Sequence, residues 1–196
     1  MPRKYRHGER RLAASEATRS KIVAAARHVL ADPATTSFSI DAIAERADVA
    51  RMTVYYQFKS KGKLLEAVFD DIATRANMRE MRNVMMEPRL EVAVGKLIDV
   101  FCHLWETQRP VVRRLTALAA LDAEVEAALM GRGNWRREAL ADIAGASLRK
   151  RKPELADLLF VLTGFETYDA LRHRFSARKV CSVLREAASA IMAGSY

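Results

Sequence analysis

The sequence has few cysteines, glycines and prolines and no long apolar run. Its 196 residues include 2 cysteines, 8 glycines and 5 prolines. Cys102 and Cys181 lack metal-ligand spacing, so we expect no metal site and a reducing environment in which both stay thiols. No segment approaches the roughly 18 apolar residues that cross a bilayer, and the first thirty residues lack the apolar stretch of a secretion signal. These absences favour a cytoplasmic protein without a membrane span.

The usual signatures of catalytic sites are also missing. The sequence shows no glycine-rich phosphate loop, no nucleophile elbow and no metal-binding spacing. The four histidines are scattered at positions 7, 28, 103 and 173. We therefore expect no catalytic residues, no cofactor and no metal, and a small helical enzyme is the least favoured alternative.

The residues that are abundant favour helices. Hydrophobic residues make up 50% of the chain and charged residues 29%, and Ala, Leu, Arg and Glu are frequent. Apolar residues recur at helical spacing along most of the chain, and no strand-like alternation is found. The sequence predicts an all-α protein.

The net charge of +9 is unevenly distributed. Residues 1–61 hold 12 Lys/Arg against 6 Asp/Glu, and the rest of the chain is much closer to neutral. A basic N-terminal third suits a polyanionic partner, because Lys and Arg that neutralise phosphates release counterions. A solvated basic surface without a partner is the alternative.

The first fifteen residues show no apolar periodicity and predict a flexible basic arm. Such arms wrap a duplex or enter its minor groove, and a ragged terminus is the alternative. Glu9 is the one acidic residue among the basic ones, which are Arg3, Lys4, Arg6, Arg10 and Arg11.

Three helices follow the arm and predict a helix-turn-helix motif at about 38–57. The first begins near Thr18 and ends at Asp32-Pro33. Ser39 fits the N-cap of a short helix over 40–46, and a second short helix spans 50–56. Asp48 lies between them and tolerates the left-handed backbone of a tight turn.

The segment from Ser39 to Leu65 resembles the TetR family of transcriptional regulators. The resemblance rests on Ile43-Ala44, Ala47, Val49, Thr53, Tyr55, Phe58, Lys61 and Leu64-Leu65, and upstream on Arg19, Ile22, Ala25 and Ala26. The chain departs from the family pattern at Asp48, where glycine is usual, and at Ala50, where serine is usual. The lost cap at Ala50 costs about 1 kcal/mol.

The resemblance implies a DNA-binding helix-turn-helix domain over 16–62 and a helical ligand-sensing and dimerisation domain over 63–196. It implies a homodimeric, sequence-specific repressor that a small-molecule effector releases from a near-palindromic DNA operator. A non-specific architectural DNA-binding protein is the main rival, and activation instead of repression is a further possibility.

The exposed side of the second short helix carries the predicted DNA contacts. Arg51 has the paired donors that recognise guanine, and Met52 and Tyr56 suit thymine methyl groups or base edges. Following the family positions, Thr53, Tyr55 and Lys61 are expected at phosphates, and so are Ser39 and its helix N-terminus. For Met52, Thr53 and Tyr55 a plain surface position is the alternative, and Val54 and Phe58 are assigned to the core.

Further helices are expected over 61–85, from about Val94 to a stop at Pro110, and then over 111–120, 122–130, 133–150, 154–174 and 176–193. The helix around Leu158–Phe165 is apolar on nearly all sides, so we expect it to pack on a second subunit together with 176–193. Burial within one subunit is the alternative. The expected dimer contacts are Leu158, Leu162, Phe165, Val180 and Leu184.

An effector pocket is harder to place from sequence. Apolar side chains with a few polar groups at helical spacing form the expected lining, and packing in an ordinary core is the alternative for each of them. The expected lining residues are Phe101, Cys102, Trp105, Trp135, Thr163, Thr167 and Tyr168.

Overall fold

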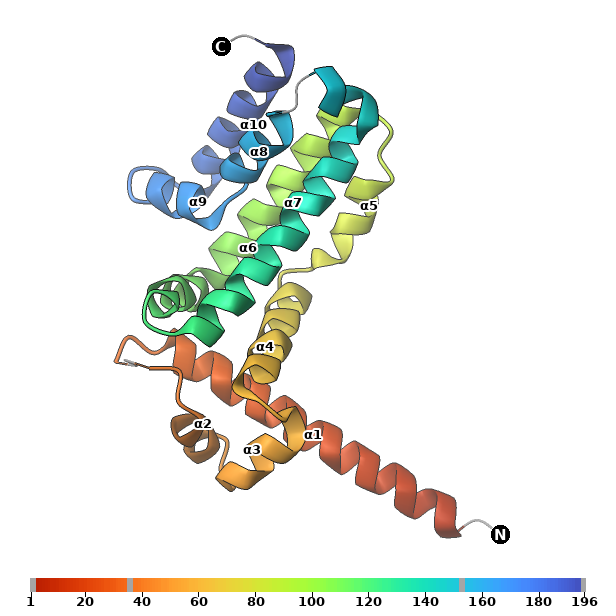
Figure 1. The fold of residues 1–196 in the computed structure, drawn as a ribbon, viewed down its shortest axis with the longest axis vertical. Coiled ribbons are helices and arrows are strands. Elements are labelled where there is room, and N and C mark those ends of the chain that lie inside the picture. Colours follow the sequence, from red (N-terminus) through yellow and green to blue (C-terminus); the bar gives the residue numbers. More distant parts are fainter. Residues whose placement is uncertain (1–2, 35–36, 152–153, 195–196) are drawn as a thin grey trace. The chain divides into compact units, whose positions relative to one another are not determined.

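The computed structural model describes residues 3–34, 37–151 and 154–194, and for 3–8, 144 and 146–151 it describes the backbone. Every regular element in these ranges is a helix (Figure 1). The chain forms two compact units. Unit 1 contains the residues up to Asp71 together with Arg113–Ala128, and unit 2 contains Ile72–Val112 together with the residues from Leu129 onward.

The first helix, α1, spans Arg3–Ala31. The expectation of a flexible arm is therefore wrong from Arg3 onward. Arg, Glu, Leu and Ala are strong helix formers, and an extension of an existing helix needs no new nucleation. The C-terminal half of α1 is anchored in the core by Ile22, Ala26 and Leu30, whose side chains are fully buried.

The helix-turn-helix motif is confirmed in the structure. Helix α2 spans Ile40–Arg46 and α3 spans Arg51–Phe58. Ser39 is the N-cap of α2, where its Oγ accepts a hydrogen bond from the N–H of Asp41 at 3.2 Å. Asp48 has a φ of 48°, the left-handed conformation that the sequence predicted for the turn.

Helix α4 spans Lys61–Arg75 and is shorter than the predicted 61–85. Asn77 adopts a φ of 53° and ends the helical path, because Asn tolerates the left-handed region. A short 3-10 helix, η1 (Met78–Glu80), and α5 (Met81–Met85) follow.

Two long helices run through residues that the sequence predicted as breaks. Helix α6 spans Leu90–Ala119 and continues through Pro110, and α7 spans Ala123–Arg151 and continues through Gly131 and Gly133. Val111 and Val112, directly after Pro110, are buried. Their burial offsets the roughly 3 kcal/mol that an interior proline costs. The interruption in α7 falls at Gly145, where φ is 70° and ψ is 162°.

Helices α8 (Leu155–Leu162), α9 (Phe165–Arg172) and α10 (Ala177–Ala193) complete unit 2. The predicted single helix over 154–174 is divided at Gly164, whose backbone is extended, with φ −70° and ψ 150°. Helix α10 packs along α8 (Figure 1). No helix within the described part of the chain is long and apolar enough to cross a membrane.

Candidate nucleic-acid interface

Helix α3 is fixed to α1 by its inner face. Val54 and Phe58 are buried, and the guanidinium of Arg19 lies 4.2 Å from the centre of the Phe58 ring. Arg19 also donates a hydrogen bond to the carbonyl of Gln57 at 2.9 Å, and the Gln57 amide donates to Ser15 Oγ at 3.1 Å. These contacts hold the C-terminal half of α3 and fix which side of the helix faces outward.

The outer face of α3 presents large side chains to solvent. Met52 is 72% exposed and Tyr56 is 73% exposed. Thr53 and Tyr55 are half-exposed on either side of them. The Nζ of Lys59 lies 5.1 Å from the centre of the Tyr56 ring. Large apolar side chains kept in water on one short helix mark a contact surface.

Arg51, at the start of α3, forms an ion pair with Asp41 in the first turn of α2. The Nη1 of Arg51 lies 2.9 Å from each carboxylate oxygen of Asp41. A side-chain hydrogen bond with Tyr55, followed by the charge of Asp41, raises the pKa of Arg51 above its ordinary value. The sequence analysis did not foresee this ion pair. The predicted guanine reader is thus already hydrogen-bonded in the free protein.

The N-termini of α2 and α3 differ in their caps. Ser39 caps α2, which explains its position without a phosphate partner. Ala50 occupies the N-cap of α3, where no side chain makes a capping hydrogen bond. This is the consequence expected from alanine at a position where the TetR family has serine.

Lys61, at the start of α4, is held by acidic residues that precede and begin α7. Its ammonium pairs with Asp122, and the N–H of Gly62 donates to Glu124 Oε2 at 3.1 Å. Burial opposes ionisation of Asp122, but hydrogen bonds from Lys61 and from the N–H of Val125 lower its pKa below the ordinary value. Sequence reasoning missed Asp122 because it lies far from Lys61 in the chain. For Lys61 to contact a phosphate it has to leave this carboxylate.

The basic N-terminal segment lies on the part of α1 that precedes its contacts with α3. Residues 9–14 are all exposed, including Arg10 and Arg11. The side chains of Arg3, Lys4 and Arg6 lie outside the described ones. Arg10 and Arg11 are therefore presented on a helix.

The comparisons with known proteins agree with this geometry. Residues 22–68 match the family model described as bacterial regulatory proteins, tetR family. Residues 22–68 therefore form a domain of the type that opens TetR-family regulators. The match covers α2, α3 and parts of α1 and α4, which together form the surface described above. A comparison with curated proteins gave no match.

Solved structures share the fold of this chain at low sequence identity. A transcriptional regulator from Rhodococcus sp. RHA1 has a TM-score of 0.67 and 16% identity, over 90% of this chain and 96% of its own. A TetR-like transcriptional regulator from the same organism has a TM-score of 0.63 and 18% identity, over the same shares. The fatty acid degradation regulator FadR from Bacillus halodurans has a TM-score of 0.56 and 18% identity, over 86% and 92%.

In unit 2, several of the residues predicted to line a pocket form one aromatic cluster. The rings of Phe101 and Trp105 stack with centres 5.7 Å apart, and Phe165 meets Trp105 edge-on at 5.5 Å. The indole N–H of Trp105 donates to the carbonyl of Thr163 at 2.9 Å. The hydroxyl of Tyr168 donates to Glu106 Oε2 at 2.7 Å.

Two predicted lining residues make none of these ring contacts, and one residue was missed. Trp135 is 47% exposed and the hydroxyl of Thr167 donates to the carbonyl of Val161, so their place in a pocket stays a prediction. The missed residue is Arg136, whose guanidinium lies 4.1 Å from the centre of the Phe160 ring and 5.6 Å from that of Phe101. In α7, sequence position alone did not distinguish the outward Trp135 from the inward Arg136.

Arg136 is a half-buried cation for which the described residues supply no ion-pair partner. It donates a long hydrogen bond to Thr163 Oγ1 at 3.3 Å. Burial lowers the pKa of Arg136 to about 10, and the charge of Glu166 opposes this effect without a direct contact. At neutral pH the guanidinium is charged, so the cluster has a positive charge beside its aromatic rings, with Glu166 acting on it only at a distance.

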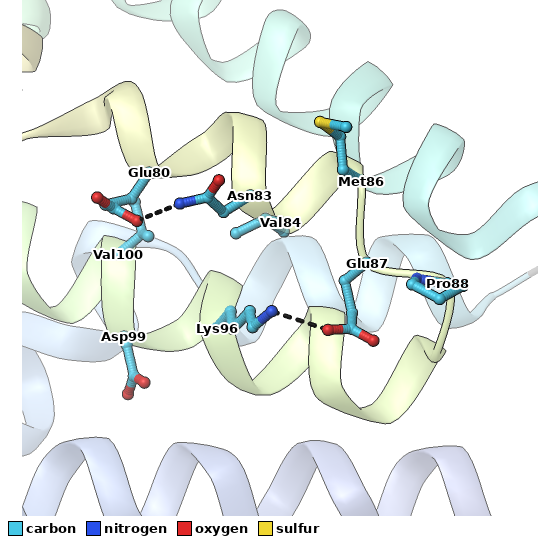
Figure 2. A pocket seen from close by; sticks show the side chains of 9 residues that line it. All are labelled: Glu80, Asn83, Val84, Met86, Glu87, Pro88, Lys96, Asp99 and Val100. Carbon is cyan, nitrogen blue, oxygen red and sulfur yellow. Dashed lines mark hydrogen bonds and ion pairs between the residues drawn. The ribbon is translucent and has the colours of Figure 1, made fainter.

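A separate open pocket of about 530 Å³ lies between α5 and α6 (Figure 2). Lys96 Nζ lies 2.8 Å from Glu87 Oε2, and the Asn83 amide donates to Glu80 Oε2 at 2.7 Å. Hydrogen bonds from Lys96 and Arg89 lower the pKa of Glu87 to about 2. Because Glu87, Glu80 and Lys96 already have partners, the pocket offers a ligand little unsatisfied charge.

The predicted dimer contacts divide into two groups. Val180, Leu184 and Phe165 are buried within unit 2 itself, so they belong to the subunit's own core, and their assignment to a partner interface is corrected. An apolar helix buries its side chains on its own neighbours first, which the sequence pattern could not distinguish. Leu158 and Leu162 on α8 remain half-exposed.

Proposed function

We propose that this chain is a homodimeric TetR-family repressor that binds a near-palindromic DNA operator through α3 and is released by a small-molecule effector. The observation that carries the proposal is the exposed outer face of α3, with Met52 and Tyr56 in solvent above a buried Val54 and Phe58. A short helix held on its inner side and open on its outer side suits insertion in a major groove.

Each side chain on this face has a proposed partner. Arg51 exchanges the carboxylate of Asp41 for the N7 and O6 of a guanine, since the two acceptors resemble each other in spacing. Met52 and Tyr56 contact thymine methyl groups and base edges. Thr53 and Tyr55 bind phosphates on either side of the groove, together with Lys61 once it is released from Asp122.

The proposed dimer interface is the apolar side of α8 and α10 that the subunit leaves open. Val161 on α8 is 60% exposed. On α10, Val183, Ala187 and Ile191 are half-exposed at helical spacing. When α8 and α10 of one subunit pack on α8 and α10 of a second subunit, the four helices bury this surface. The two α3 helices then have to lie about 34 Å apart to enter successive major grooves.

The aromatic cluster with Arg136 is the proposed effector site. An effector with an apolar body and a negatively charged head fits it, because the head neutralises Arg136 and the body replaces contacts among Phe101, Phe160 and Trp105. One similar structure is that of a fatty acid degradation regulator, which makes acyl carboxylates a reasonable first class to screen.

The first experiment separates specific reading from non-specific DNA binding. The purified protein is footprinted on its own upstream DNA, and affinities are then measured for operator variants. Arg51→Ala should lose preference at one operator position, whereas Arg11→Ala should weaken all sequences alike and reduce the salt slope by about 1. Uniform loss in both variants would favour an architectural DNA-binding protein. In vitro transcription from the same promoter decides between repression and activation.

The effector site is tested by a matched pair of substitutions in α7. Arg136→Met keeps an unbranched, largely apolar side chain but removes the charged guanidinium, and Trp135→Ala changes the exposed neighbour. Carboxylate ligands that release wild-type protein from DNA should act poorly on Arg136→Met and normally on Trp135→Ala. Equal responses of both variants would exclude Arg136 from the effector site.

A further inference from the structure

The only two cysteines of the chain, distant in sequence, are neighbours in unit 2. Cys102 lies in α6 and Cys181 in α10, and each thiol is close enough to the other to shift its pKa. The same two helices are linked next to this pair by the ion pair of Asp99 with Arg185. The thiols therefore meet between helices that other contacts also hold together.

The two sulfur atoms have different environments. Cys102 is buried, whereas Cys181 is half-exposed. Cys181 lines an open pocket of about 590 Å³ together with Asp99, Arg178, Ser182, Arg185 and Glu186. A small oxidant can therefore reach Cys181 directly, whereas Cys102 is shielded from solvent. This asymmetry separates an attacking sulfur from a resolving one.

We propose that Cys102 and Cys181 form a dithiol site that hydroperoxides convert to an intramolecular disulfide. The side-chain hydrogen bond from Cys102 lowers the pKa of Cys181, and the same contact, together with burial, raises the pKa of Cys102. Cys181 is consequently the sulfur that reaches the reactive thiolate form more readily.

The reaction has two steps. The Cys181 thiolate attacks the terminal oxygen of the hydroperoxide, the O–O bond breaks, and the alkoxide leaves as an alcohol after taking a proton, which gives a sulfenic acid at Cys181. The sulfur of Cys102 then attacks the Cys181 sulfur, the S–O bond breaks, and hydroxide leaves as water with the Cys102 proton. Two thiols lose two electrons, and the hydroperoxide is reduced by two electrons.

The disulfide would lie on the side of α10 that faces α6. On α10, Cys181 and Arg185 are on one flank of the buried stripe of Val180, Leu184 and Ala188, and Val183 and Ala187 are on the other. Oxidation therefore leaves the apolar flank unchanged. The disulfide links α10 to α6 at Cys102, which is adjacent to Phe101 of the aromatic cluster.

The test uses the full-length protein without DNA, so its outcome is independent of the proposed repressor function. Reduced protein is treated with hydrogen peroxide or cumene hydroperoxide, and free thiols are blocked before non-reducing peptide mapping by mass spectrometry. The expected product is a cross-linked peptide pair containing Cys102 and Cys181, formed within the monomer and lost on reduction. Products limited to intermolecular disulfides or to unmodified thiols would overturn the proposal.

Two variants test the order of the steps. Cys102→Ser should stop the reaction at a sulfenic acid on Cys181, which dimedone traps, whereas Cys181→Ser should leave Cys102 largely unreacted. Circular dichroism checks that both variants are folded. If either fails to fold, early time points on the wild-type protein supply the same information, because dimedone should label Cys181 first. Labelling of Cys102 first would contradict the assigned roles.

Discussion

The guanidinium of Arg51 and the carboxylate of Asp41 form an ion pair across the two helices of the DNA-binding motif, with Nη1 2.9 Å from both carboxylate oxygens. Both side chains are more than half exposed, so the pair contributes little to stability. Its position matters more, because the group best suited to bind a guanine is held by a group that DNA repels. In the proposed function, Arg51 exchanges this pair for a guanine.

The ion pair predicts a gain of affinity when Asp41 is neutralised. Asp41→Asn should bind the operator several-fold more tightly, since Arg51 is released and one negative charge leaves the surface that faces DNA. The matched control is Glu45→Gln, which removes the same charge from an exposed position on α2. Fluorescence anisotropy with operator DNA measures both. Equal gains in the two variants would show that the pair with Arg51 has no part in binding.

The uncapped N-terminus of α3 predicts a stabilising substitution. Ala50→Ser should satisfy a backbone N–H of the first turn and raise the free energy of unfolding by about 1 kcal/mol. For a chain of this size the melting temperature should rise by about 2–4 °C. Ala42→Ser, at an exposed interior position of α2, is the control and should bring no gain. A melting temperature unchanged by Ala50→Ser would show that the first turn of α3 is already satisfied.

Glu106 predicts a dependence of stability on pH. Hydrogen bonds from Arg172 and Tyr168 lower the pKa of Glu106 from 4.5 to about 2. A carboxylate whose pKa is lowered by folding stabilises the protein at pH values above its ordinary pKa. This contribution is lost as the pH falls from 4.5 through about 2. Because Glu106 is partly exposed, solvent screening makes the contribution modest.

Urea unfolding at several pH values measures this contribution. Glu106→Gln should be less stable than wild type at neutral pH, and the difference should shrink as the solution is acidified. Glu91→Gln, at an exposed position of the same helix, is the control and should show a smaller difference at all pH values. A difference between wild type and Glu106→Gln that stays constant with pH would refute this role of Glu106.

The ion pair of Lys61 with Asp122 predicts that substitutions at Asp122 change both DNA affinity and stability. Asp122→Asn should free Lys61 for a phosphate and so strengthen binding to all DNA sequences, while it lowers stability because the half-buried Lys61 loses its partner. The double variant Lys61→Met/Asp122→Asn should lose the affinity gain. Operator affinity measured against salt concentration tests this, and weaker binding by Asp122→Asn would contradict the phosphate role of Lys61.

The sequence predicted the motif well because its signals are local. The Ser39 cap, the tolerance of Asp48 for a left-handed turn and the apolar positions of α2 and α3 all act within a few residues. The predicted stop at Pro110 was wrong because burial on both sides overrides the local cost of a proline.

Partners across the chain were outside the reach of the sequence. Nothing near Lys61 or Arg51 indicates that Asp122 or Asp41 lies within hydrogen-bonding distance. Helical periodicity placed Val180 and Leu184 on one apolar side of a helix. It could not show whether that side packs in the subunit's own core or against a partner. Contacts between distant segments decide both questions, and these depend on the whole fold.

The central claim is that the outer face of α3 reads base edges in the major groove. Methylation protection of guanine N7 on the footprinted operator tests it most directly. We expect protected guanines in two patches about one helical turn apart on one face of the duplex, with one guanine losing protection in Arg51→Ala. Protection absent from the major groove, or unchanged by Arg51→Ala, would contradict it.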